Sequence, residues 1–167
     1  MGKKKTTTGN LTRKRLGELH FDMGNPRFGG RAGDIKTETA TLDYIVENFG
    51  IEDVISSIAA NGYFESEPLV GVQKNNGIRI LEGNRRLAAC LILAGDPRAA
   101  QQQKRMDQAK SLMATSGVEP PEDLPVLVVT AVEQKKQMLA YLGVRHICGL
   151  SEWDSYAKAV WIANVLV

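Results

Sequence analysis

The segment Gly83-Asn84-Arg85-Arg86 has the residue types and the spacing of a phosphate-binding turn, because it follows an apolar run and opens a helical pattern. A glycine lets a ligand approach the main chain, and free amide groups at the start of a helix favour an anion. Guanidinium groups add charge-assisted hydrogen bonds that can be bidentate to phosphate oxygens. The pattern predicts that Gly83, Asn84, Arg85 and Arg86 bind phosphate. The alternative is that both arginines are exposed helix residues paired with surface acids.

Two further residues have the chemistry of a general acid or base. Glu82 precedes the turn, where it could position a water or a metal ion, or face solvent at the end of a hairpin. His146 follows Arg145, and a histidine there could donate to phosphate or exchange a proton near neutral pH. A structural hydrogen bond is the alternative for His146. His20, beside Phe21, is predicted to be a packing or strand-end residue.

The elements that must position this turn follow from hydrophobic periodicity. Apolar residues at helical spacing on both sides of Gly50 predict two short helices, or one broken helix, ending near residue 62. A hairpin is predicted next, then a helix after Gly83. The two strands of the hairpin are predicted over residues 68–72 and 78–81. The later predicted elements are a helix over 98–115, a strand over 124–129, and helices over 130–142 and from 151. This order predicts an α+β fold and disfavours a doubly wound sheet.

The composition is that of a globular domain. The chain has 167 residues, of which 43% are hydrophobic and 24% charged, so it is long enough for one domain with a continuous core. No apolar run approaches the ~20 residues that span a membrane, and no secretory signal is present, so we expect a cytoplasmic location and no membrane partner. Cys90 and Cys148 lie far apart in the sequence, which predicts neither a disulfide framework nor a zinc site.

Positive charge is concentrated at the N-terminus. Residues 1–16 contain six Lys and Arg and no acidic residue, although the net charge of the whole chain is only +2. We therefore predict a flexible basic arm over residues 1–16 and one domain over residues 17–167. The arm could contact DNA non-specifically through counterion release, or be an inert solvated tail. The chain stops inside a helical pattern, from which we expect it to be the N-terminal part of a longer protein.

Three segments together resemble the N-terminal domain of the ParB/sulfiredoxin superfamily. They are residues 57–63, residues 67–72 with the sequence Glu-Pro-Leu-Val-Gly-Val, and residues 81–89 with the Gly-Asn-Arg-Arg turn. A later Pro-Val-x-Val strand of the family corresponds to residues 125–128. The resemblance covers residues 20–165, with 97–123 as an insert, and it implies a small mixed sheet with flanking helices.

The resemblance also implies a ligand and the residues that bind it. The Gly-x-x-Arg turn of ParB proteins binds the triphosphate of a cytidine nucleotide, and this turn maps onto residues 83–86. A second family segment, which contacts nucleotide and metal, corresponds to residues 143–149. That segment makes Arg145 and His146 candidate phosphate ligands, although it lacks the family's Glu-Asn pair. Asn-Pro-Arg at 25–27 resembles another family element and adds Arg27. The implied ligand is a nucleoside triphosphate, CTP or ATP, with Mg²⁺.

The function that the resemblance implies is a nucleotide-dependent switch for self-association as a homodimer or for DNA engagement, with or without slow nucleotide hydrolysis. In the family a later helix-turn-helix domain recognises specific DNA, so specific recognition is not expected of these residues. A ParB-like metal-dependent nuclease, drawing on carboxylates such as Glu67 and Glu82, and a protein-interaction module without nucleotide remain alternatives. Sulfiredoxin chemistry is not expected, because Asn84 stands where that family has its reactive cysteine. Cys90 is predicted to be a small core residue.

Overall fold

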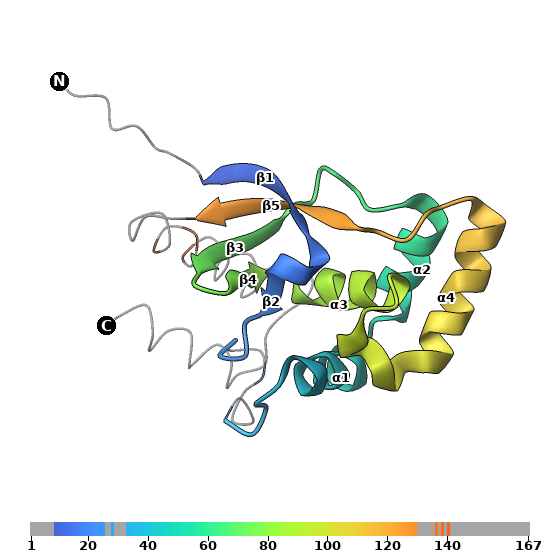
Figure 1. Cartoon of the computed structure of the whole chain (residues 1–167), viewed down its shortest axis with the longest axis horizontal. Coiled ribbons are helices and arrows are strands. Elements are labelled where there is room, and N and C mark those ends of the chain that lie inside the picture. Colours follow the sequence, from blue (N-terminus) through green and yellow to red (C-terminus); the bar gives the residue numbers. More distant parts are fainter. Residues whose placement is uncertain are drawn as a thin grey trace.

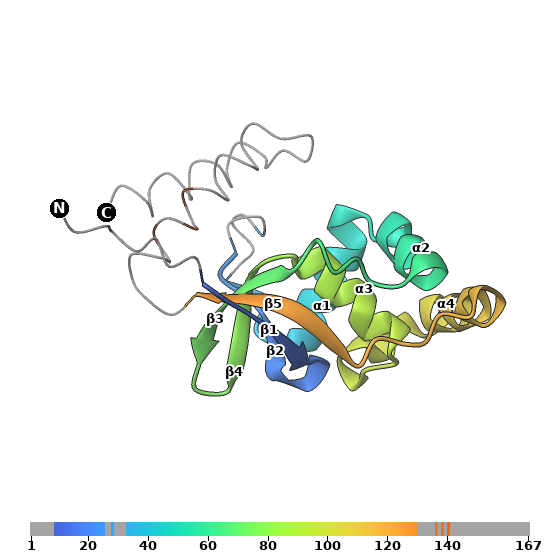
Figure 2. The ribbon, with the colours of Figure 1, turned by 90° about the horizontal axis from the view of Figure 1, so that it is seen from above.

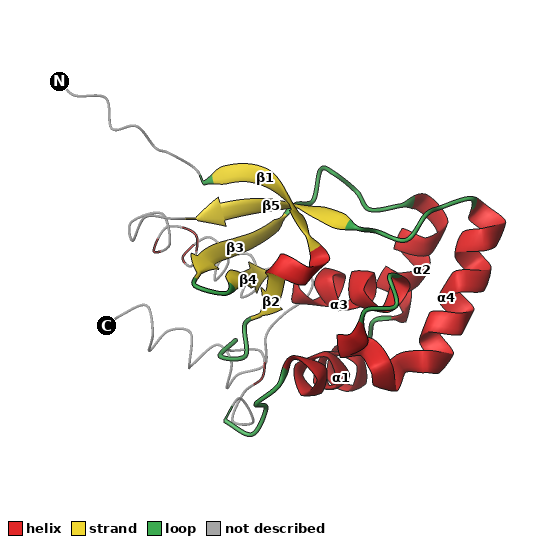
Figure 3. Cartoon of the chain, in the orientation of Figure 1, coloured by secondary structure: helices red, strands yellow, loops and turns green. Residues whose placement is uncertain are grey.

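The computed structural model describes residues 9–25, 28, 33–129, 136, 138 and 140, and every structural statement below concerns these residues. They form a five-stranded sheet with helices packed against one of its faces (Figure 1 and Figure 3). The strands are β1 (Asn10–Arg15), β2 (Leu19–Phe21), β3 (Leu69–Lys74), β4 (Gly77–Glu82) and β5 (Asp123–Val129). The helical segments are η1 (Leu16–Glu18), α1 (Glu38–Phe49), α2 (Glu52–Asn61), α3 (Asn84–Leu93), η3 (Pro97–Gln102) and α4 (Gln103–Ser116).

The sheet is mixed, with the strand order β1-β5-β3-β4-β2. Antiparallel pairs join β1 to β5 and β3 to β4, whereas β3 with β5 and β4 with β2 are parallel. A parallel neighbour needs a crossover connection, and the helices supply these connections. The combination of hairpin, crossovers and helices confirms the α+β prediction and the small mixed sheet with flanking helices.

Local signals in the sequence account for most of the helix boundaries. The side chain of Thr37 accepts a hydrogen bond from the amide of Ala40 (3.1 Å) and caps α1. Gly50, with φ of 60°, separates α1 from α2 and confirms the predicted break. The segment predicted as one helix over 98–115 is η3 followed by α4, with a non-helical residue, Ala99, inside η3. Of the predicted helix over 130–142, the described residues 136, 138 and 140 are helical.

The core lies between the sheet and the helices, and α3 runs through its centre. Every residue from Leu87 to Leu93 is buried, because α3 contacts the sheet on one side and α1, α2 and α4 on the others. The core side of the sheet presents alternate residues of β4 and β5, such as Ile78, Ile80 and Val126. The opposite side carries a smaller cluster of Val70, Val72 and Val129, on which Met138 packs. Figure 2 shows the helices gathered on the core side of the strands.

Part of the segment predicted as a flexible basic arm is a strand of the sheet. Residues 10–15, assigned to a flexible basic segment, form the edge strand β1 and pair with β5 over its whole length. Apart from Leu11 this stretch is polar, so its hydrophobic pattern gives no strand signal. Main-chain pairing and the hydrogen bond from Arg13 Nε to the Asp123 carboxylate (2.7 Å) hold it in place. Residues 1–8 lie outside the described part of the chain.

Arg98 joins the N-terminal strands to the helical layer. Its guanidinium group donates to the main-chain oxygens of Leu16 (2.9 Å) and Leu19 (2.6 Å). It also forms ion pairs with the carboxylates of Asp96 (2.9 Å) and Glu38 (3.3 Å). Only 16% of the Arg98 side chain is exposed. One side chain therefore connects η3, α1 and the turn between β1 and β2.

Within the described residues, no helix has the length and apolar character needed to cross a membrane.

Candidate functional site

Gly83 adopts a backbone conformation that favours glycine at the junction between β4 and α3. Its φ of 99° and ψ of 19° lie in the left-handed region, and it is the N-cap residue of α3 without a side-chain cap. A β-carbon at this position would overlap Leu69 Cδ2 and lie 3.2 Å from Arg86 Nη2. The guanidinium group of Arg86 thus packs beside the backbone of Gly83. The start of α3 and a cationic group meet at this point, as the sequence predicts.

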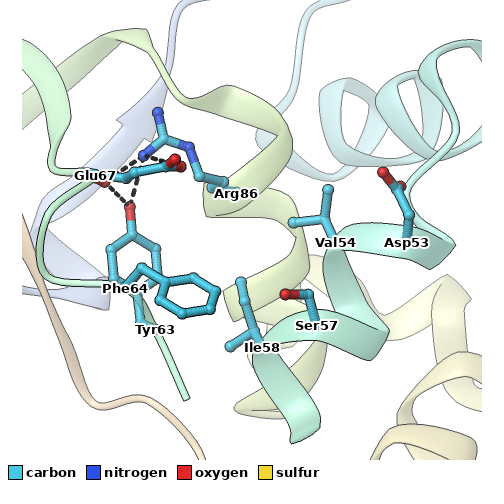
Figure 4. Close-up of a pocket in the computed structure, with 8 residues that line it drawn as sticks. All are labelled: Asp53, Val54, Ser57, Ile58, Tyr63, Phe64, Glu67 and Arg86. Atoms are coloured by element: carbon cyan, nitrogen blue, oxygen red, sulfur yellow. Dashed lines mark hydrogen bonds and ion pairs between the residues drawn. The ribbon is translucent and has the colours of Figure 1, made fainter. Parts of the chain in front are cut away.

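Arg86 is held through Nη1, which also lies 4.0 Å from the carboxylate of Glu67. Its Nη1 donates to the hydroxyl of Tyr63 (3.0 Å) and to the main-chain oxygen of Glu67, and Tyr63 in turn donates to the same oxygen (2.6 Å; Figure 4). Among the described residues, Nε and Nη2 of Arg86 have no hydrogen-bond partner. The side chain is 16% exposed. The Nε–Nη2 edge is the pair of nitrogens that can bind two oxygens of one anion side by side.

Arg85 lies on a different side of α3, since adjacent helical residues point about 100° apart. Its Nε and Nη2 donate to the main-chain oxygen of Gly50 (3.0 and 2.7 Å), and Nη2 also bonds the carboxylate of Asp53 (3.0 Å). These contacts connect α3 to the junction between α1 and α2. Arg85 therefore has a structural use in this conformation, and its binding to phosphate stays a prediction.

Asn84 also contacts the preceding strand. Its amide nitrogen donates to the main-chain oxygen of Ile80 (3.1 Å), whereas its buried Oδ1 has no hydrogen-bond partner in the described chain. Buried polar atoms are usually paired, so an unpaired oxygen next to the start of α3 is unusual. Through Nδ2, Asn84 thus ties the first turn of α3 to β4.

A pocket of about 290 Å³ opens beside Arg86. It lies between α2 and the loop 62–68, as Figure 4 shows, and it is lined by Asp53, Val54, Ser57, Ile58, Tyr63, Phe64, Glu67 and Arg86. The Phe64 residue is 51% exposed, which is high for a large aromatic residue. The pocket thus combines apolar side chains with polar and charged groups. Sequence reasoning assigned no role to Phe64, and the aromatic pair after Asn61-Gly62 is the signal that could have drawn attention to it.

Burial raises the pKa of the Tyr63 hydroxyl. Removal from solvent raises its pKa to about 12, and this effect outweighs the nearby positive charge of Arg86, which acts in the opposite direction. The hydroxyl therefore stays neutral across the physiological pH range. It can accept from Arg86 and donate to Glu67 at the same time.

The other predicted residues are not shown to lie at the pocket. Arg27, Arg145 and His146 lie outside the described residues, so their place relative to Gly83 stays a prediction. Glu82 ends β4, directly before the turn, and is half-buried. His20 is the middle residue of β2, where it contacts the main-chain oxygen of Asn76 (2.9 Å) through Nε2 and lies 3.6 Å from the carboxylate of Glu38. In the described parts of the chain, no three His, Cys, Asp or Glu residues are grouped to hold a metal ion.

No protein-family model matches the chain, and no curated protein matches it.

Cys90 should be unreactive and replaceable. It is fully buried within α3, and burial raises the pKa of its thiol to about 12, so almost no thiolate forms near neutral pH. In a Cys148→Ala background, a polar disulfide reagent should modify Cys90 no faster than the protein unfolds. Cys90→Ala should lower the free energy of unfolding by about 1–2 kcal/mol, the cost of a small core deletion. Rapid modification of the folded protein would contradict the assignment.

Proposed function

We propose that the chain is a nucleotide-binding domain in which the turn from Gly83 to Arg86 holds the phosphates. The observation that carries the proposal is the position of Arg86 Nη2, 3.2 Å from where a β-carbon of Gly83 would lie, on the guanidinium edge that has no hydrogen-bond partner among the described residues. An uncapped helix start supplies amide donors and the positive end of the helix dipole beside this edge. Two independent sources of positive potential therefore converge where a phosphate could approach the main chain.

The pocket beside Arg86 supports a ligand larger than inorganic phosphate. Its volume of about 290 Å³ is close to the lower end of typical ligand pockets, about 300–1,000 Å³. Phe64 and Ile58 offer apolar surface to a ring, and the carboxylates of Asp53 and Glu67 can accept hydrogen bonds from it. We therefore favour a nucleoside triphosphate, CTP or ATP, over a simple anion. Mg²⁺ would bind mainly through the phosphates, with Glu82 as the nearest carboxylate in the sequence.

The loop that lines the pocket also offers a route for a nucleotide-dependent switch. Glu65, in the loop 62–68, forms an ion pair with Arg13 of β1 (2.6 Å), and Arg13 also bonds Asp123 of β5. These side chains are exposed, so the pairs are individually weak and can exchange. A change in the loop on nucleotide binding would alter the charge environment of β1. Such a change would link the site to self-association as a homodimer or to non-specific DNA binding.

Substitution of Arg86 tests the proposal. Loss of a charge-assisted contact typically costs about 1.5–3 kcal/mol, so Arg86→Ala should weaken binding of the preferred triphosphate about ten- to a hundredfold. Arg86→Lys should restore only part of the affinity, because an ammonium group cannot reproduce the two-nitrogen edge. Calorimetric titration with CTP, ATP, GTP and UTP, with and without Mg²⁺, gives the affinities directly.

Arg105→Ala is a matched control, since Arg105 pairs with Glu52 on the helical surface and is not among the residues that line the pocket. It should bind nucleotide like the parent protein. If Arg86→Ala also binds like the parent, the phosphates are held elsewhere and the proposal is wrong. Cleavage of plasmid DNA that requires a metal ion, without nucleotide binding, would instead favour the nuclease alternative.

A further inference from the structure

We propose that Tyr63 is a positioning residue of the phosphate site, which fixes Arg86 so that the free edge of its guanidinium group faces the start of α3. This inference rests on the proposed function, and it assigns a specific task to a residue outside the Gly83–Arg86 turn. Tyr63 does not contact the ligand itself. It acts through Arg86.

The guanidinium group of Arg86 has a held half, Nη1, which forms hydrogen bonds, and a free half, Nε and Nη2, which has no hydrogen-bond partner among the described residues. Nη1 carries two N–H groups, and its closest acceptors are the hydroxyl of Tyr63 and the main-chain oxygen of Glu67. The main-chain oxygen of Pro68 (3.5 Å) and the carboxylate of Glu67 (4.0 Å) lie on the same side of the group. The three N–H groups on Nε and Nη2 have no partner among the described residues. Since a guanidinium group is planar and rigid, fixing one nitrogen fixes the direction in which the other two point.

The free half points towards the helix start. Nη2 would lie 3.2 Å from a β-carbon on Gly83, so it is adjacent to the N-cap of α3. Without an anchor, a long arginine side chain would populate several rotamers and would lose that entropy on binding an anion. The anchor reduces this loss before the ligand arrives. Preorganisation of this kind increases affinity without an additional contact to the ligand.

Tyr63 is suited to this task because it is itself held. Its ring is half-buried against the core, and its hydroxyl donates to the Glu67 main-chain oxygen over 2.6 Å. The same hydroxyl accepts a hydrogen bond from Arg86, so Arg86, Tyr63 and Glu67 form one hydrogen-bonded network (Figure 4). Phenylalanine at position 63 would fill the same space but could not take part in this network.

A double-mutant cycle with Arg86 separates positioning from a structural role. Inorganic tripolyphosphate serves as the probe, and its affinity is measured calorimetrically at constant ionic strength. Tyr63→Phe should weaken binding about tenfold in the parent protein. In the Arg86→Lys background the same substitution should change affinity less than about twofold, because lysine has no planar edge to orient.

Tyr44→Phe is the matched control, because Tyr44 is a partly buried tyrosine in a separate aromatic cluster with Phe28 and Phe49. It should leave tripolyphosphate affinity unchanged. NMR of the Arg86 Nε–H group provides a second measurement. In the parent protein this group should give one sharp resonance that shifts with tripolyphosphate, and in Tyr63→Phe the unliganded resonance should broaden.

The possible results distinguish the inference from the proposed function. If the parent protein does not bind tripolyphosphate, the proposed function fails and the inference fails with it. If binding depends on Arg86 but Tyr63→Phe binds like the parent, the inference alone is wrong. Equal losses in the parent and Arg86→Lys backgrounds would show a purely structural role for Tyr63, and would also overturn the inference.

Discussion

Replacing Arg98 with alanine is expected to lower the free energy of unfolding by about 3 kcal/mol. The substitution removes hydrogen bonds to the main-chain oxygens of Leu16 and Leu19, and it leaves the carboxylates of Asp96 and Glu38 without their shared cation. Breaking a largely buried ion pair by deleting one partner typically costs about 3–5 kcal/mol, and we take the lower figure because the carboxylates retain some exposure. Denaturant unfolding followed by circular dichroism measures the effect.

The effect of Arg98→Ala should also depend on pH. Burial alone would raise the pKa of Asp96, but hydrogen bonds from the side chain and amide of Arg98 outweigh it and hold this pKa below the ordinary value of 3.8. The stability gained from the ionised carboxylate is therefore present above 3.8 and is lost as pH falls through the lowered pKa. The difference between the parent protein and Arg98→Ala should be largest near neutral pH and should shrink in acid.

Arg105→Ala is the control for this measurement. Arg105 is 37% exposed and pairs with the exposed carboxylate of Glu52, so its loss should cost no more than about 1 kcal/mol. Equal effects of the two substitutions would show that Arg98 does not connect the strands to the helices in the way its contacts indicate.

Gly83→Ala should affect both stability and ligand binding. Alanine in the left-handed conformation is strained by about 1–2 kcal/mol, and its β-carbon would in addition overlap the fully buried side chain of Leu69. We expect a loss of about 3 kcal/mol in the free energy of unfolding. The new methyl group would also stand between Arg86 Nη2 and the start of α3, so nucleotide binding should become undetectable by calorimetry.

Gly117→Ala is the control that separates the strain of the left-handed backbone from the overlap of the new β-carbon with Leu69. Gly117 has φ of 72° and ψ of 17°, close to the conformation of Gly83, but a β-carbon there would meet no atom within 4 Å. This variant should lose only about 1 kcal/mol and should bind nucleotide normally. If Gly83→Ala retains full affinity, no phosphate approaches the backbone at this turn.

The elements with local signals could be predicted from the sequence. The break at Gly50, the hairpin between β3 and β4, and the helix after Gly83 each depend on residues that are neighbours in the chain. The edge strands β1 and β2 could not be predicted in this way. β1 is polar and β2 has three residues, so their positions depend on main-chain pairing and side-chain contacts with elements far away in the chain.

The candidate site could also be predicted only where its signals are local in the sequence. The sequence identified the turn from Gly83 to Arg86, because glycine and guanidinium groups next to a helix start have a recognisable chemistry. It could not assign different partners to Arg85 and Arg86, since those partners come from Gly50 and from Tyr63, far away in the chain. The pocket beside Phe64 was also missed, because a half-exposed aromatic residue is evident only once the surrounding elements are placed.

The pairing of β1 with β5 has a consequence for biosynthesis. Arg13 and its partner Asp123 are 110 positions apart, so β1 leaves the ribosome long before the strand that completes it. At common translation rates this delay is on the order of ten seconds. During that time β1 is an unpaired strand that could associate with other nascent chains. Its cluster of Arg13, Lys14 and Arg15 opposes such association, because like charges repel and charged edge strands resist aggregation.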